Sequence, residues 1–202
     1  MATITFLHFG IQNRGKNMEL LIAGLIIFFG IHLMPASSSL RSSLLSKLGE
    51  KGYKAVFALI SLAGMVLIVL GKGAADFIEI YEPPAWGMHV TGLLMLFALL
   101  AMVSFIIKSR LRKITPHPML WGVSFWATGH LVANGDLASL LLFGSFLLYS
   151  QLTIITANRR GARVSDEKIS LMQDGVALVV AALAYFGLMM FHASFTGISL
   201  IS

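Results

Sequence analysis

The sequence predicts an all-α protein, a polytopic transmembrane helical bundle of about six spans with a short interfacial amphipathic helix. Three observations predict this fold class. Of the 202 residues, 57% are hydrophobic and 12% are charged, whereas soluble globular proteins carry about 25% charged residues. The apolar residues form runs close to the roughly 20 residues that a spanning helix needs. The basic residues gather in alternate loops, so the net charge of +6 indicates membrane topology and a lipid bilayer, not nucleic acid.

The lengths of the apolar runs define the elements. Residues 1–17 form an N-terminal extension, whose basic residues follow its apolar stretch, the wrong order for a secretory signal peptide. Residues 18–202 form one transmembrane domain. The six predicted spans are residues 18–35, 54–71, 88–107, 117–134, 137–157 and 175–195. The fourth is the least apolar of these.

A short amphipathic helix is predicted between the first two spans, in the segment SSSLRSSLLSKLGEKGYK. Leucines recur there at helical spacing and basic residues occupy the opposite face, which favours a helix lying in the membrane interface. These leucines are Leu40, Leu44, Leu45 and Leu48.

The basic residues also predict the orientation. They occupy the first, third and fifth loops, which the positive-inside rule places in the cytoplasm, with both termini on the opposite, periplasmic side. The basic residues of these loops are Arg41, Lys47, Lys51, Lys54, Lys108, Arg110, Arg112, Lys113, Arg159, Arg160, Arg163 and Lys168. The opposite loops contain acidic residues, with Lys72 as their single cation.

The absence of cysteine excludes disulfides, thiolate metal ligands and covalent attachment of a c-type haem. The sequence also lacks an HExxH zinc motif, a phosphate-binding loop and a nucleophile elbow. A metal or cofactor would therefore be held by histidine, carboxylate or noncovalent packing, and no catalytic residue is identified.

His130 is the leading candidate site residue, because polar side chains at membrane depth are costly and usually face the bundle interior. Trp126 and Asn134 share its helix face at the i−4 and i+4 positions. Gly122 and Gly129 line an adjacent strip where another backbone can approach closely. Small residues beside a Trp and a His are typical of a slot for a planar cofactor, and equally of an ordinary helix contact.

The other polar residues at span ends have structural readings, and some of them have functional readings as well. His32 lies in an apolar, aromatic-lined stretch that suits either a flat hydrophobic ligand or ordinary packing. His117, between two prolines, is predicted to cap the fourth span, and His89 to be an interfacial anchor beside a Pro-Pro turn. Asp136 is either a turn residue or the acid that orients an imidazole or a ligand.

Three blocks of the sequence resemble the NnrU family of bacterial membrane proteins. They are GIHLMPASSSLR, PPAWGMH and HPMLWGVSFWATGHLVANGDLASLLLFGSFLLY, and the resemblance extends over residues 18–160. It implies a multi-pass protein of the bacterial inner membrane with a role in nitrite and nitric oxide metabolism, that is, in denitrification. The same superfamily includes the 15-cis-zeta-carotene isomerases, which use a noncovalent b-type haem.

The resemblance to the isomerases implies a haem b site in this chain. Their haem ligands map to His32 and His130, and the residues around His130 that would complete the site are Trp126, Asn134 and Asp136. A cysteine that takes part in ligand switching in those enzymes maps to Ala127. The resemblance therefore implies haem binding more strongly than redox-switched isomerisation.

Straight spans would place His32 near the inner surface and His130 near the outer one, on the order of 20 Å apart. One iron cannot bind both histidines at that distance. Two alternatives follow. Either the hairpin of the fourth and fifth spans is re-entrant, with its tip near the membrane midplane, or His130 pairs with His89 in the outer half.

Three functions remain open from the sequence. The first is a haem protein of nitrogen-oxide metabolism that acts through redox or ligand sensing. The second is an enzyme on a hydrophobic or small volatile substrate, such as a polyene cis-trans isomerase or a thiol S-methyltransferase, although no Gly-rich loop is present to bind S-adenosylmethionine. The third is a noncatalytic membrane subunit of a reductase.

Overall fold

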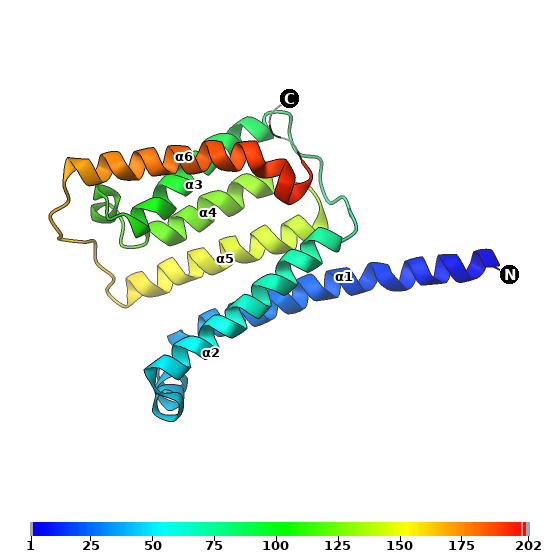
Figure 1. The fold of residues 1–202 in the computed structure, drawn as a ribbon, viewed down its shortest axis with the longest axis horizontal. Coiled ribbons are helices and arrows are strands. Elements are labelled where there is room, and N and C mark those ends of the chain that lie inside the picture. Colours follow the sequence, from blue (N-terminus) through cyan, green and yellow to red (C-terminus); the bar gives the residue numbers. More distant parts are fainter. Residues whose placement is uncertain (1, 199, 201–202) are drawn as a thin grey trace. The chain divides into compact units, whose positions relative to one another are not determined.

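Helices account for nearly all of the regular structure, as the apolar runs predict. The structure is a computed structural model that describes residues 2–198 and 200, with the backbone alone for residues 2–16, 36 and 195. The described residues form six α-helices, two short 3-10 helices and no strand (Figure 1). The α-helices are α1 (Ala2–Leu33), α2 (Ser38–Ala74), α3 (Gly87–Ile106), α4 (Pro118–Ala133), α5 (Leu137–Arg159) and α6 (Leu171–Thr196). The predicted all-α class is confirmed.

Within the described part of the chain, four helices are long and apolar enough to cross a bilayer. They are α2, α3, α5 and the Leu171–Ser194 part of α6. The first predicted span corresponds to a shorter apolar helix, Asn17–Leu33, inside α1. The fourth corresponds to α4, whose 16 residues rise about 24 Å, less than the roughly 30 Å of a hydrocarbon core. The chain is therefore a membrane protein in which α4 is the shortest of the predicted spans.

The chain divides into two compact units. The first contains Met1–Glu79 and Asp136–Leu142, and the second contains Ile80–Gly135 and Phe143–Ser202. Each unit is described by itself below.

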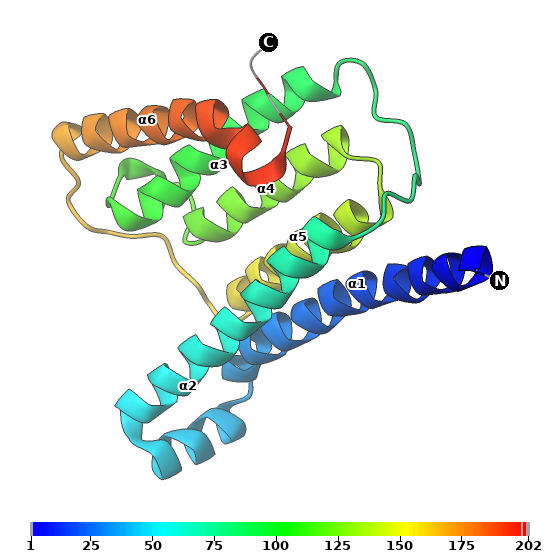
Figure 2. The same ribbon diagram turned by 45° about the vertical axis from the view of Figure 1, so that its right-hand side comes forward.

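In the first unit, α1 packs along α2 through glycines (Figure 2). A Cβ added to Gly24 would lie 2.7 Å from the backbone nitrogen of Ile68, and one added to Gly64 would lie 2.9 Å from that of Phe28. Lipid is as apolar as a leucine side chain, so membrane helices associate through close packing of this kind more than through the hydrophobic effect. The buried Leu21 fills the same seam.

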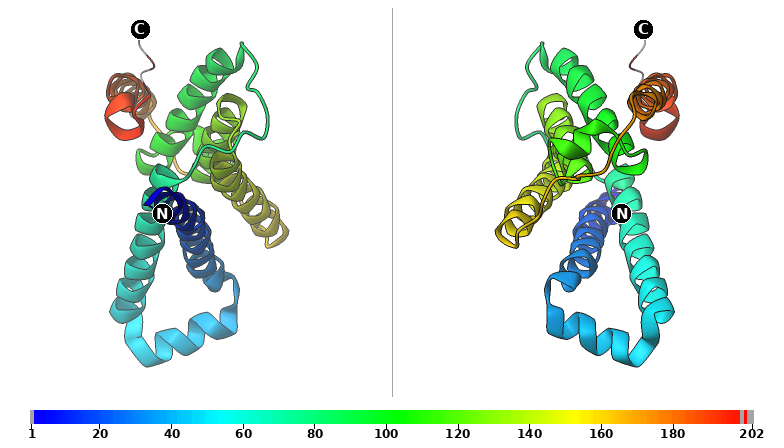
Figure 3. Two further views of the ribbon diagram at one scale, coloured as in Figure 1. Left: turned by 90° about the vertical axis from the view of Figure 1, so that its right-hand side faces the viewer. Right: turned by 90° about the vertical axis from the view of Figure 1, so that its left-hand side faces the viewer.

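Helix α2 has a kink at Gly49, where φ is 68° and ψ is 172°. Only glycine adopts this left-handed region without a steric cost. The arm before the kink begins at the N-cap Ser37, whose hydroxyl accepts from the amide of Leu40. Figure 3 shows this arm lying crosswise to α1 and to the rest of α2. The predicted amphipathic segment is thus confirmed as a helix.

In the second unit, α4 packs closely on α3. A Cβ added to Gly122 would lie 2.6 Å from Cγ of Met102 and 2.9 Å from the carbonyl oxygen of Ala98. The predicted backbone approach at this glycine is confirmed, and α3 occupies the strip that the sequence offered to a planar cofactor. Helix α6 covers α3 elsewhere, where its buried Ala177 and Ala181 meet Val103.

Ion pairs hold the basic loops of the second unit together. Lys108 Nζ lies 2.7 Å from Glu167 Oε1, and Arg110 Nε lies 3.1 Å from Asp174 Oδ2. The second 3-10 helix (Arg110–Lys113) lies in this region. These ion pairs connect the segment that follows α3 with the segment that leads into α6.

Candidate functional site

His130 lies in the last turn of α4 among aromatic rings of the second unit. Its ring stacks on Phe143 of α5, with centroids 4.5 Å apart and planes at 27°. Trp126, one turn earlier, has its centroid 5.4 Å from that of His130. Trp126 also makes T-shaped contacts with Phe143 and Phe146, with ring centroids 5.0 Å and 5.4 Å apart. The structure therefore surrounds His130 with apolar aromatic groups from two helices.

The hydrogen bonding of His130 fixes its tautomer. Nδ1 lies 2.9 Å from the carbonyl oxygen of Trp126. A carbonyl can only accept, so Nδ1 carries the proton and Nε2 presents its lone pair. No described residue hydrogen-bonds to Nε2. Metal-ligating histidines typically donate their other ring N–H to a backbone carbonyl in this way.

Asn134 and Tyr81 secure the turn that contains His130. The side-chain amide of Asn134 donates to the carbonyl oxygen of His130 at 2.8 Å, and its backbone N–H donates to the same oxygen at 2.9 Å. The Tyr81 hydroxyl donates to the carbonyl oxygens of Leu131 and of Asn134, the latter at 2.8 Å. Asn134 was predicted as a cofactor-binding residue, and the structure gives it a helix-capping role. Tyr81 was missed, because nothing in its loop sequence indicates which helix it contacts.

Asp136 pairs with Lys72 in the first unit. Lys72 Nζ lies 3.0 Å from Asp136 Oδ1, and the side-chain exposures are 32% and 8%. The same oxygen accepts the backbone N–H of Ser139 at 3.0 Å, so Asp136 caps the start of α5. Burial raises the pKa of Asp136, but the hydrogen bonds from Ser139 and Lys72 outweigh it and hold the pKa below its ordinary value. Of the two sequence readings of Asp136, the structure supplies the contacts of a turn and cap residue.

The Lys72 pair also locates Asp136 along α2 within the first unit. Lys72 lies in the last turn of α2, whereas the ring of His32 lies against Phe57, with centroids 5.2 Å apart. Fifteen residues of α2 separate Phe57 from Lys72, which corresponds to about 22 Å. Asp136 therefore lies at the end of α2 that is remote from His32.

His32 has a local geometry like that of His130. Its Nδ1 lies 2.7 Å from the carbonyl oxygen of Phe28, and its ring stacks on the Phe28 ring at 4.1 Å. Phe57 is a second aromatic neighbour, so the imidazole has aromatic neighbours from both α1 and α2. His32 belongs to the first unit and His130 to the second.

The remaining sequence candidates lie at helix ends. His117 is the N-cap residue of α4, before Pro118 in the first turn. Its Nε2 lies 2.8 Å from Asn158 Oδ1, so its ring contacts the end of α5. His89 is exposed in the first turn of α3, beside the exposed Trp86. These positions agree with the interpretation of His117 as a helix cap and of His89 as an interfacial anchor.

A cluster of polar side chains also joins α4 and α5. The hydroxyls of Ser124 and Ser150 lie 2.8 Å apart, and Gln151 Nε2 donates to Ser124 Oγ at 2.7 Å. Both serines are buried. Hydrogen bonds between membrane helices stabilise their association. Sequence reasoning missed this cluster, because isolated serines in apolar helices carry no signal of their partners.

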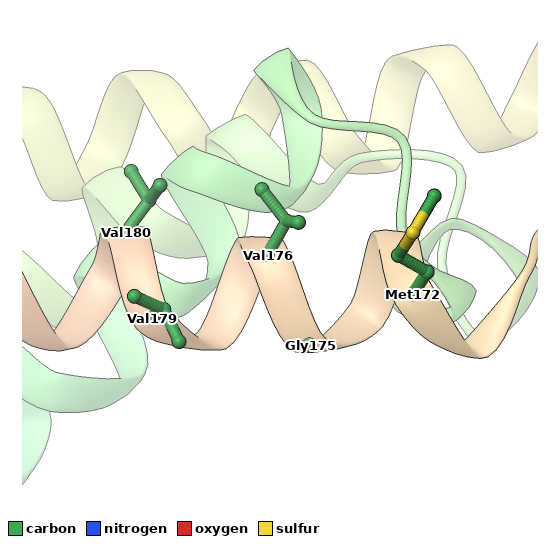
Figure 4. A pocket seen from close by; sticks show the side chains of 5 residues that line it. All are labelled: Met172, Gly175, Val176, Val179 and Val180. Atoms are coloured by element: carbon green, nitrogen blue, oxygen red, sulfur yellow. The ribbon is translucent and has the colours of Figure 1, made fainter.

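An open depression lies on one face of α6, and Figure 4 shows the side chains that line it. Its volume is about 380 Å³, and its lining consists of Met172, Gly175, Val176, Val179 and Val180. No polar group is available there to bind or react with a ligand, so this surface is suited to lipid chains. Among the described residues, no three or more His, Asp or Glu side chains are placed to hold a metal ion together.

Comparison with known proteins connects these features to a family. The family model described as NnrU protein matches residues 20–200, which include His32, His130 and the whole α4–α5 hairpin. The resemblance seen in the sequence is thereby confirmed. No curated protein and no solved structure matches the chain.

Proposed function

Because the chain belongs to the NnrU family, we propose that this membrane protein binds b-type haem through His130 and acts in nitrite and nitric oxide metabolism. The observation that carries the proposal is the geometry of His130. Its Nδ1 is held by a backbone carbonyl, and its Nε2 lone pair is available to an iron. When bound, haem iron supplies a centre that exchanges electrons and binds small nitrogen oxides.

The donors and neighbours present fit this cofactor. The chain has no cysteine, so it cannot attach a haem covalently as a c-type cytochrome does or ligate the iron through a thiolate, and histidine is one of the donors that it can supply. The rings of Trp126, Phe143 and Phe146 make the surroundings of His130 apolar and aromatic, the kind of surroundings that suit a porphyrin. A second residue that would hold the haem iron is His32 by the family resemblance, or His89 by the alternative of straight spans.

The haem proposal is tested by the visible spectrum of the full chain, purified in detergent from haem-supplemented cells. We expect a Soret band in the wild type, its loss in His130→Ala and its retention in His117→Ala. His117 is the matched control, because it caps the start of the same helix and its Nε2 already contacts Asn158. A wild-type protein without a Soret band would overturn haem binding. Equal loss in both variants would overturn the assignment to His130.

The role in nitrogen-oxide metabolism is tested separately in cells. Deletion of the gene should slow the consumption of nitrite or nitric oxide, and the wild-type chain should restore it whereas His130→Ala should not. If deletion leaves this consumption unchanged and a polyene or thiol substrate accumulates, the enzyme alternative replaces the proposal. Recovery of a reductase with a haem-free chain would support the subunit alternative instead.

The proposal includes the orientation in a bacterial inner membrane, with the basic loops in the cytoplasm. Single-cysteine labelling tests this, because the chain has no cysteine of its own. In intact spheroplasts an impermeant maleimide should label Glu82→Cys and not Ser43→Cys, until the membrane is opened. The reverse pattern would contradict the orientation.

A further inference from the structure

Basic residues gather at one end of the second unit, in two segments that are distant in the sequence. Residues 108–113 and 159–174, here called the basic end, contain eight basic and three acidic side chains, a net charge of +5. Figure 1 shows both segments where α3 and α5 end and α6 begins. These three helices are long and apolar enough to cross a bilayer, so the basic end lies at a membrane surface.

Hydrogen bonds hold the two basic segments together. The backbone N–H of Ser165 donates to the carbonyl oxygen of Arg112 at 3.0 Å. Close by in the sequence, His117 Nε2 lies 2.8 Å from Asn158 Oδ1, and this contact connects the start of α4 with the end of α5. The two contacts place the segments side by side, so their cations belong to one surface of the unit.

Most of the positive charge at the basic end is not balanced within the protein. Two of the three acids are used in ion pairs, Glu167 with Lys108 and Asp174 with Arg110. In the part of the chain that the structure describes, five exposed cations of the basic end take part in no ion pair. They are Lys113, Arg159, Arg160, Arg163 and Lys168. Exposed positive charge at a membrane surface attracts anionic lipids.

Exposed apolar side chains lie next to these cations. Ile114, directly after the first segment, is 77% exposed, and Leu171 and Met172, which follow Lys168, are 71% and 76% exposed. Met172 also begins the apolar depression of about 380 Å³ on α6, which continues to Val180 (Figure 4). Positive charge and apolar surface therefore adjoin at the start of α6, as the phosphate and the acyl chains adjoin in a phospholipid.

We propose that the basic end binds an anionic phospholipid, with the lipid phosphate at the exposed cations and an acyl chain in the depression on α6. Arginine and lysine bind phosphate through charge-assisted hydrogen bonds, and the residues that line the depression are apolar. The inference does not depend on haem binding. The structural alternative is that the cations only set the orientation of the chain in the membrane, in which case lipids with and without net charge would bind equally.

Thermal unfolding of the full chain in detergent, with dioleoyl phosphatidylglycerol or dioleoyl phosphatidylcholine added, tests the proposal. A ligand that binds the folded state raises the melting temperature. We expect phosphatidylglycerol to raise it by about 5 °C at a concentration about a hundredfold above its Kd, and phosphatidylcholine to change it little. An equal response to both lipids would overturn the proposal in favour of the structural alternative.

A variant with four cations of the basic end replaced by glutamine locates the site. Each cation near an anionic lipid surface strengthens binding about fivefold, so we expect the affinity for phosphatidylglycerol to fall at least about a hundredfold. The four positions are Lys113, Arg160, Arg163 and Lys168.

The matched control removes four cations from the first unit and should keep the response to phosphatidylglycerol. Its positions are Arg41, Lys47, Lys51 and Lys54. Equal losses in the two variants would make the response an effect of net charge and overturn the assignment to the basic end.

The place of the acyl chain is tested at two glycines of α6. A Cβ added to Gly175 or to Gly187 meets nothing within 4 Å, but only Gly175 lines the depression. Gly175→Leu should therefore weaken the response to phosphatidylglycerol, whereas Gly187→Leu should not. Glycerol 3-phosphate, a headgroup without chains, should not stabilise the wild type. Stabilisation by it as large as that by the lipid would overturn the proposal in favour of a free phosphate. If the glutamine variant does not fold, the comparison of the two glycines decides.

Discussion

The ammonium nitrogen of Lys72 lies 3.0 Å from Oδ1 of Asp136, and this oxygen also caps α5 through Ser139. One carboxylate thus connects the last turn of α2 with the first turn of α5. The contact explains why the acidic side of the predicted topology contains a lysine. It also explains why Asp136, although buried, remains a carboxylate.

Removing the charge of Asp136 should destabilise the protein. In Asp136→Asn, Lys72 loses its partner while the amide retains part of the cap, so we expect a loss of about 2 kcal/mol. Breaking a fully buried pair costs about 3–5 kcal/mol, and the partial exposure of Lys72 reduces this. Thermal unfolding in detergent, followed by circular dichroism, measures the change.

Lys54→Met is the control for this prediction. Its pair with Glu50 is exposed, with side-chain exposures of 70% and 74%, so we expect less than about 0.5 kcal/mol. Equal effects of the two substitutions would contradict a special contribution of the Lys72 contact.

The stability contributed by Asp136 should depend on pH. Its folded-state pKa lies below the ordinary value of 3.8, so the unfolded chain binds a proton first as the pH falls. The contribution is therefore complete well above pH 3.8 and decreases as the pH falls through 3.8 and then through the folded-state pKa. The difference in melting temperature between the wild type and Asp136→Asn should be constant near neutrality and shrink in acid. A constant difference down to pH 3 would contradict the assignment.

Gly135 should not accept a side chain. The carbonyl oxygen of Tyr81 occupies the space of a Cβ at this position, and the Gly135 carbonyl accepts from the Ile80 amide at 2.8 Å. Gly135→Ala must therefore move the turn that follows α4, and we expect a loss of at least about 2 kcal/mol. Gly144→Ala is the matched control, because a Cβ there meets nothing within 4 Å. It should be neutral or stabilising by up to about 1 kcal/mol.

The close packing of α1 against α2 leads to a further prediction. Gly24→Ala should separate these helices, since its Cβ would lie 2.7 Å from a backbone nitrogen of α2. Gly30→Ala, on the same helix with nothing within 4 Å, should leave the melting temperature unchanged or higher. Protease resistance of the α1–α2 pair in detergent provides a second measurement. Equal behaviour of the two variants would argue against close packing at Gly24.

Local sequence patterns predicted the helices well. The predicted spans 88–107 and 117–134 correspond to α3 (Gly87–Ile106) and α4 (Pro118–Ala133). Apolar run length, Pro118 at a helix start and the turn before Asp136 are properties of neighbouring residues, and each acts within a few positions. The amphipathic segment before Gly49 was predicted for the same reason.

Contacts between segments that are distant in the sequence could not be predicted from local patterns. Nothing local to Lys72 indicates Asp136, and nothing local to His130 indicates the ring of Phe143, since both contacts depend on how helices pack. The glycine strip at Gly122 predicted that a backbone would approach closely, but not that this backbone would be α3. Pairing between charged or aromatic residues of different helices required the structure.

The Lys72–Asp136 contact also has a consequence for biogenesis. The two residues are 64 positions apart, and the first unit takes its last piece from Asp136–Leu142. During synthesis the hairpin of α1 and α2 is therefore complete, with Lys72 in it, before Asp136 is made, and it has to wait for α3 and α4 to follow. A chain that ends after α3 should be a substrate for membrane proteases, and the first unit should become resistant only once the ribosome has delivered the start of α5.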